Sequence, residues 1–229
     1  MTATQARTQH NGWKCFGAAA CCASAILTSG CTLVGGAMES YRESSTKVVE
    51  PDYLGLEGKS YAVLVTAERS IQADHPSLVD YLTGQMTARL AASTNLPRAG
   101  GFVPAAQVLK YVYSNPGWTA RGYADVAKEL GGVDRLIVVE VIEFRLHDPG
   151  NQYLWDGIAG GTVSVIETDS LLADDVAYNR AITVDFPDQQ GYGPNEMSEP
   201  TVRTELARRL LDRASWLFYS HDEPYYPEY

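Results

Sequence analysis

Apolar residues recur with the period of an α-helix in four stretches of the chain. Leu78, Leu82, Met86 and Leu90 lie four residues apart and would form one buried stripe along a helix. The helices that this pattern predicts span residues 76–92, 104–113, 123–130 and 201–219.

Shorter apolar runs, bounded by residues typical of turns, predict strands. Residues 61–66 and the first half of 134–146 are apolar at successive positions, which is typical of strands covered on both faces. The predicted strands span residues 61–66, 101–103, 134–146, 153–167 and 176–186. The last three are separated only by short polar segments, which predicts an antiparallel three-strand meander. We therefore expect an α/β (α+β) fold of order β-α-β-α-α-β-β-β-α, with helices packed on a mixed sheet.

The first 31 residues contain every cysteine of the chain and follow the order of a secretory leader. A basic start with Arg7 and Lys14 precedes the apolar residues 15–27, and the small residues 28–30 lie directly before Cys31. The four cysteines are Cys15, Cys21, Cys22 and Cys31.

This segment resembles the lipobox of bacterial lipoproteins, in which the peptide is cut before a cysteine that carries acyl chains. The resemblance implies a signal peptide over residues 1–30 and lipidation of Cys31, so that acyl chains would hold the protein at a membrane. Thr32 follows the cysteine, and in that family the absence of Asp there implies an outer-membrane lipoprotein facing the periplasm. Two alternatives stay open: an uncleaved N-terminal membrane anchor, because the uncharged residues 15–38 are long enough to span a bilayer, and a plain secretory signal.

Composition divides the rest of the chain into three parts. We expect a lipidated tether over residues 31–57, a single α/β domain over 58–220, and a tail rich in Pro and Tyr over 221–229. The formal charge of −10 would become −12 once Arg7 and Lys14 are removed with the leader. Such acidity argues against nucleic acid as a partner, because nucleic-acid binding depends on neutralising phosphates.

The order of elements resembles a domain shared by the curli-export lipoprotein CsgG and the amino-terminal part of TolB. The resemblance rests on Lys59-Ser-Tyr-Ala-Val-Leu-Val65 and on Glu129-Leu-Gly-Gly-Val-Asp-Arg-Leu-Ile-Val138, which would open a long-stranded hairpin. The pore-forming segments of CsgG are not evident, so no secretion channel is implied. The resemblance implies a non-catalytic binding or assembly protein of the cell envelope. We expect no cofactor, and as partner an envelope protein or a second copy of the chain.

Candidate chemistry is sparse. The sequence contains no nucleophile elbow, zinc-protease motif or phosphate-binding loop, so no catalytic residue is assigned. Glu140 is the sharpest candidate, because a regularly alternating strand would place it on one face with apolar residues and bury its carboxylate. A nearby arginine, or a bulge that turns Glu140 outward, would give it a structural role instead. The apolar residues expected on that face are Leu136, Val138, Ile142, Phe144 and Leu146.

His147 and His221 are weak candidates for metal binding, because each is followed directly by Asp. Both also lie where an element is expected to end, and a structural role is favoured there. The alternative function is therefore a small-molecule- or metal-binding enzyme that uses Glu140 and His147. In the tail, Tyr225, Tyr226 and Tyr229 are candidate partner contacts, since tyrosine is common at interfaces, although a strap folded onto the domain is equally compatible.

Overall fold

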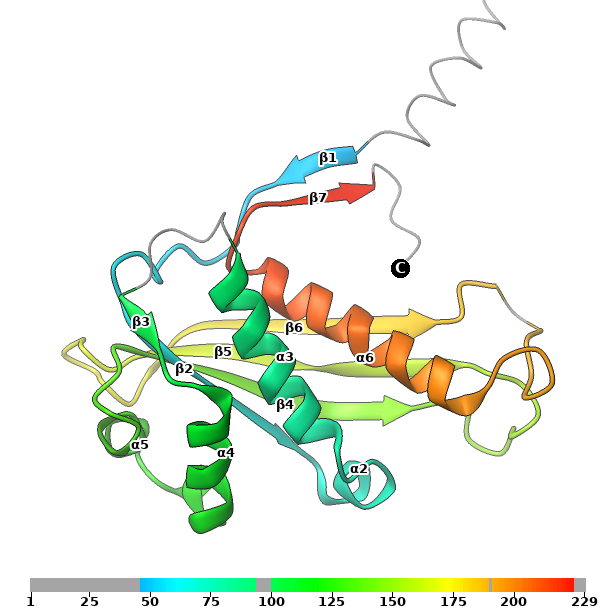
Figure 1. Cartoon of the computed structure of the whole chain (residues 1–229), viewed down its shortest axis with the longest axis horizontal. Coiled ribbons are helices and arrows are strands. Elements are labelled where there is room, and N and C mark those ends of the chain that lie inside the picture. Colours follow the sequence, from blue (N-terminus) through cyan, green and yellow to red (C-terminus); the bar gives the residue numbers. More distant parts are fainter. Residues whose placement is uncertain (1–45, 94–99, 190, 225–229) are drawn as a thin grey trace, which may run out of the picture. The chain divides into compact units, whose positions relative to one another are not determined.

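The computed structural model describes residues 46–93, 100–189 and 191–224, and its elements confirm the predicted α/β (α+β) fold (Figure 1). The strands are β1 (Thr46–Val49), β2 (Ser60–Ala67), β3 (Gly101–Phe102), β4 (Arg135–Arg145), β5 (Gly157–Glu167), β6 (Val176–Phe186) and β7 (His221–Pro224). The helices are α2 (Arg69–Asp74), α3 (Leu78–Ala92), α4 (Ala105–Ser114), the 3-10 turn η1 (Trp118–Ala120), α5 (Tyr123–Glu129) and α6 (Glu199–Trp216).

The main sheet has five strands in the order β3-β2-β4-β5-β6. Strands β3 and β4 run parallel to β2, whereas β4, β5 and β6 form the expected antiparallel meander. The sheet is therefore mixed, with its parallel half around β2. A separate two-stranded sheet pairs β1 with β7.

The central strands are covered on both faces. The side chains of β2 and β4 that point to one face, including Val63 and Val139, pack with α3 and α6. The alternate set, including Leu64 and Val138, packs with α4, η1 and α5. This two-sided burial confirms the expectation drawn from the continuous apolar runs.

Small residues in β5 allow α6 to approach the sheet closely. A Cβ added at Gly157 would meet the Phe186 carbonyl oxygen at 2.8 Å and the Leu206 side chain of α6 at 3.3 Å. Ala159, on the same face, is fully buried. The strip of small residues is therefore used for helix packing.

Folded residues begin earlier than the expected tether boundary. Tyr53 and Leu56 lie within the core, and the Tyr53 amide donates to the Leu217 carbonyl at 2.9 Å. The Tyr53 hydroxyl donates to Glu167 at 2.8 Å and accepts from the buried Arg135 Nε at 3.1 Å. These long-range bonds join residues 53–56 to β4 and β5, which composition alone could not indicate.

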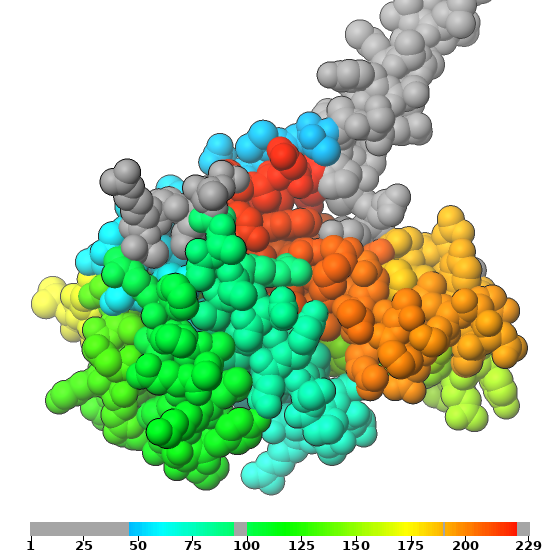
Figure 2. All heavy atoms as spheres, in the orientation of Figure 1, coloured from blue at the N-terminus to red at the C-terminus, as the bar shows by residue number. Residues whose placement is uncertain are grey.

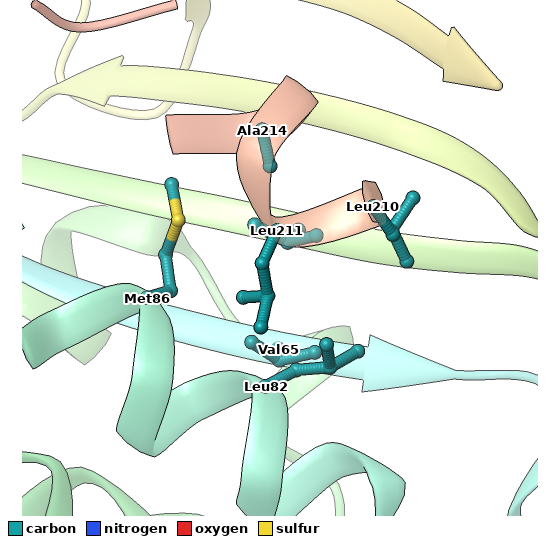
Figure 3. Close-up of a pocket in the computed structure, with 7 residues that line it drawn as sticks. Val65, Leu82, Met86, Leu210, Leu211 and Ala214 are labelled. Atoms are coloured by element: carbon teal, nitrogen blue, oxygen red, sulfur yellow. The ribbon is translucent and has the colours of Figure 1, made fainter. Parts of the chain in front are cut away.

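An apolar cavity of about 10 Å³ lies under α3 and α6 (Figure 3). Only hydrocarbon and thioether groups line it, so a water molecule would find no hydrogen-bond partner there. It is a packing gap rather than a binding site. The lining residues are Val65, Leu82, Met86, Val139, Leu210, Leu211 and Ala214.

Candidate functional site

The expected burial of Glu140 is wrong, because the residue is exposed. Glu140 does share a face with Leu136 and Val138, but the helices on that side cover only the first half of β4. Its cross-strand neighbours are the half-buried Thr66 and Thr162 rather than apolar groups. Glu140 is therefore a solvated carboxylate on an open part of the sheet.

A β-bulge explains why simple alternation failed in this strand. Val141 pairs with Gly161 and Glu143 with Gly160, which leaves Ile142 as an extra residue in β4. The extra residue moves Phe144 and Leu146 to the α6 side of the sheet. The apolar residues expected beside Glu140 thus lie on two different faces of the sheet: Leu136 and Val138 on one, and Phe144 and Leu146 on the other.

The two candidate histidines each contact an aromatic ring. His147 stacks on Trp155 with ring centroids 4.3 Å apart, and its Nδ1 donates to the Leu154 carbonyl at 2.7 Å. His221 stacks on Trp216, also at 4.3 Å. Throughout the described ranges there is no group of three or more His, Cys, Asp or Glu residues able to hold a metal ion. The structure thus gives each histidine a packing role.

Two other predictions concern parts of the chain outside the described residues. Cys31 and the leader precede residue 46, and Tyr225, Tyr226 and Tyr229 follow residue 224. Within residues 46–93, 100–189 and 191–224, no helix is both long and apolar enough to cross a bilayer.

Two loops at one end of the meander present large apolar side chains to solvent. Tyr153 and Leu154, in the β4–β5 loop, are 76% and 41% exposed, and Tyr192, in the β6–α6 loop, is 36% exposed. We call these three residues the aromatic surface. Tyrosine is enriched at protein interfaces, so this surface is a candidate contact site.

Trp155 fixes the two loops to each other. It is 5% exposed, and its backbone amide donates to the Tyr192 carbonyl at 2.8 Å. Its indole Nε1 donates to the Met197 carbonyl, also at 2.8 Å. Stacking with His147 covers the ring. Trp155 thereby joins the two loops through two hydrogen bonds.

Gly193 permits this close approach. A Cβ at that position would lie 2.7 Å from the Tyr153 carbonyl oxygen, which is shorter than real Cβ contacts. The Gly193 amide also donates to Glu196 Oε2 at 2.9 Å. Glycine is therefore required for the loops to touch.

Carboxylates surround the aromatic surface. Asp148, Asp156 and Glu196 are exposed on the same two loops, and Arg145 pairs with Asp148 at 2.7 Å. Hydrogen bonding to Asp148 raises the pKa of the Asp156 carboxyl. The surroundings are thus acidic and would favour basic groups on a partner.

Sequence reasoning missed the aromatic surface. The pattern placed Tyr153 within a strand, whereas β5 begins at Gly157. The available signal was the run Tyr153-Leu154-Trp155, two residues after the Pro149-Gly150 turn, where three large apolar residues are unusual. Nothing in the sequence linked that run to Tyr192.

Comparisons with known proteins gave only distant likenesses. No family model matches the sequence, and a search of curated proteins found no match. Among solved structures, the chain is similar to the lipoprotein GNA1162 from Neisseria meningitidis, with 11% identity, a TM-score of 0.43, and coverage of 68% of this chain and 98% of that one. It is also similar to PelC, solved as a dodecamer, from Paraburkholderia phytofirmans, with 14% identity, a TM-score of 0.39, and coverage of 76% and 98%. The hypothetical protein CT253 from Chlamydia trachomatis gives 16% identity, a TM-score of 0.39, and coverage of 69% and 93%.

Proposed function

We propose that this chain is an envelope lipoprotein, anchored through acyl chains on Cys31, whose folded body binds another protein without catalysis. The observation that carries the binding role is the aromatic surface, in which exposed Tyr153, Leu154 and Tyr192 stand on loops that Trp155 joins to each other. Loops joined in this way lose less conformational entropy on binding, so their contacts convert more fully into affinity.

The acidic surroundings narrow the choice of partner. Asp148, Asp156 and Glu196 would meet basic side chains on an envelope protein, while the tyrosines fill apolar pockets at the centre of the contact. A second copy of the chain is the other candidate partner. Self-association would need a basic patch elsewhere on the same chain.

Photo-crosslinking in intact cells tests the binding role. A photoreactive phenylalanine analogue in place of Tyr153 should trap a discrete partner. The same analogue in place of Leu171, which is fully exposed in the β5–β6 hairpin, is the control. Tyr153→Ala and Tyr192→Ala should each weaken association about 30-fold, since a central aromatic contact is worth about 2 kcal/mol. Equal crosslinking from positions 153 and 171 would contradict the proposal.

Anchoring is tested separately. Metabolic labelling with an alkyne fatty acid should mark the wild-type chain and not Cys31→Ala, and mass spectrometry should find residues 1–30 absent from the mature protein. Fractionation should then place the labelled chain in the outer membrane, exposed to the periplasm. Retention of residues 1–30 on most of the protein would refute lipidation and support the uncleaved anchor.

A further inference from the structure

A cleft of about 600 Å³ lies at the end of β2. The last residues of β2, helix α2 and the start of α3 form one side, and α4 with η1 forms the other. In Figure 2 the spheres of α3 and α4 border one another. The volume falls within the range of about 300–1,000 Å³ that is typical of small-molecule sites.

The position of the cleft follows from the topology. The chain leaves β2 into α3, which packs on one face of the sheet, and leaves β3 into α4, which packs on the other. Neighbouring parallel strands whose helices depart on opposite faces leave a crevice at their carboxyl ends. Open α/β sheets bind their ligands in such crevices.

The walls of the cleft are mixed, with apolar residues beside the polar side chains of Thr66, Gln72, Asp80, Tyr113 and Thr119. Val79, Leu109, Val112 and the buried Trp118 supply hydrocarbon and indole surface. The carboxylate of Asp80 accepts a hydrogen bond from the Tyr113 hydroxyl, which joins α3 to α4. This mixed wall suits an amphipathic ligand, with an apolar or aromatic body and a polar group.

Arg69 is the one cationic side chain among the described residues that line the cleft, and it is exposed. Among the described residues, no hydrogen bond, ion pair or ring contact engages its guanidinium. Arg135 and Arg209, by contrast, are buried and held by carboxylates. An arginine with free donors at such a cleft is suited to bidentate binding of a phosphate or carboxylate.

We infer that this cleft binds a small organic anion, an apolar or aromatic body that carries a phosphate or carboxylate group. Arg69 binds the anionic group, and Val79, Leu109, Val112 and Trp118 enclose the body. The site shares no residue with the aromatic surface, so it is a second binding function that does not depend on the first.

Calorimetry on the full chain in non-ionic detergent tests this inference. The probes are 1-naphthyl phosphate, 1-naphthoate, 1-naphthol and inorganic phosphate, each with a protein-free micelle blank. We expect at least one naphthyl anion to bind with a Kd below about 1 mM and about 10-fold or more tighter than inorganic phosphate. Comparing the two naphthyl anions decides between a phosphate and a carboxylate ligand.

Two variants and one control assign the site. Arg69→Gln should weaken the naphthyl anion about 10-fold or more, as expected for loss of a charge-assisted hydrogen bond, and leave 1-naphthol unchanged. Thr119→Trp, at an exposed lining position, should block the anion and 1-naphthol alike. Arg180→Gln removes an exposed arginine near Asp52, on β6, and should change neither. Equal affinity of wild type and Arg69→Gln, or binding of naphthyl anions no tighter than inorganic phosphate, would overturn the inference.

Discussion

The hydroxyl of Tyr61 offers a sharp test of how this core is built. Tyr61 is 1% exposed, and its hydroxyl has no hydrogen-bond partner among the described residues. An unpartnered buried hydroxyl costs about 1–3 kcal/mol of folding free energy, so Tyr61→Phe should stabilise the protein by about 1 kcal/mol. Tyr53→Phe is the matched control. It loses the bonds to Glu167 and Arg135 and should lower the free energy of unfolding by about 2 kcal/mol.

The stability difference between wild type and Tyr61→Phe should also change at alkaline pH. Burial raises the pKa of Tyr61 from 10.0 to about 12, so the folded state favours the neutral phenol. The free energy of unfolding is unaffected by this pKa difference below pH 10. It falls as the pH rises from 10 towards 12, because the Tyr61 phenol ionises in the unfolded chain first. At 1.36 kcal/mol per pKa unit, up to about 3 kcal/mol is lost by wild type and retained by Tyr61→Phe.

Urea unfolding at pH 7 and pH 11, followed by tryptophan fluorescence, measures both effects. Tyr61→Phe should shift the midpoint upward at pH 7 with an unchanged slope, and its advantage over wild type should grow at pH 11. A loss of more than about 0.5 kcal/mol at pH 7 would show that the hydroxyl makes a stabilising bond and would refute the reasoning.

Three further outcomes are expected. Burial and the nearby Arg203 lower the pKa of His75, so the free energy of unfolding should fall as pH drops below about 6.5, and urea unfolding of His75→Gln should show a smaller fall. Gly193→Ala should disrupt the loop contact and weaken crosslinking at the aromatic surface, whereas Gly84→Ala, with open space around a helical glycine, should raise the unfolding free energy by about 0.5–1 kcal/mol. Arg209→Met removes the buried guanidinium that bonds Asp188 and the Asp185 carbonyl, and should cost about 2 kcal/mol in denaturant titration; a change below about 0.5 kcal/mol would mean that solvent replaces these bonds.

The elements of the central sheet were predictable because local pattern and tertiary burial agree there. Strand β2 lies between helices on both faces, so nearly every position must be apolar, and the continuous run 61–66 carries that requirement in the sequence. The meander was predictable for a related reason, since three strands joined by short connections have few other pairings.

The exposure of Glu140 could not be predicted from the alternation of residues along its strand. Strand alternation predicts faces only while pairing stays in register, and the extra residue Ile142 between Val141 and Glu143 broke that register. The exposure of Glu140 depends on how far α4 and α5 extend over the sheet, because Glu140 lies beyond the part of β4 that these helices cover.

By itself, the sequence determined the fold class, the strands of the main sheet and the two-faced burial of the central strands, since each follows from residues adjacent in the chain. It did not predict helix α2, nor the pairing of β1 with β7, two strands that lie in segments expected to be a tether and a tail. Only the tertiary structure decided the aromatic surface and the cleft. Tyr153 and Tyr192 are brought to one place by Trp155 and by the missing side chain of Gly193, contacts between loops far apart in sequence. Arg69 lines the cleft only because α4 and η1 lie opposite the end of β2. Such pairings depend on distances between elements, and the periodicity of a single element carries no record of them.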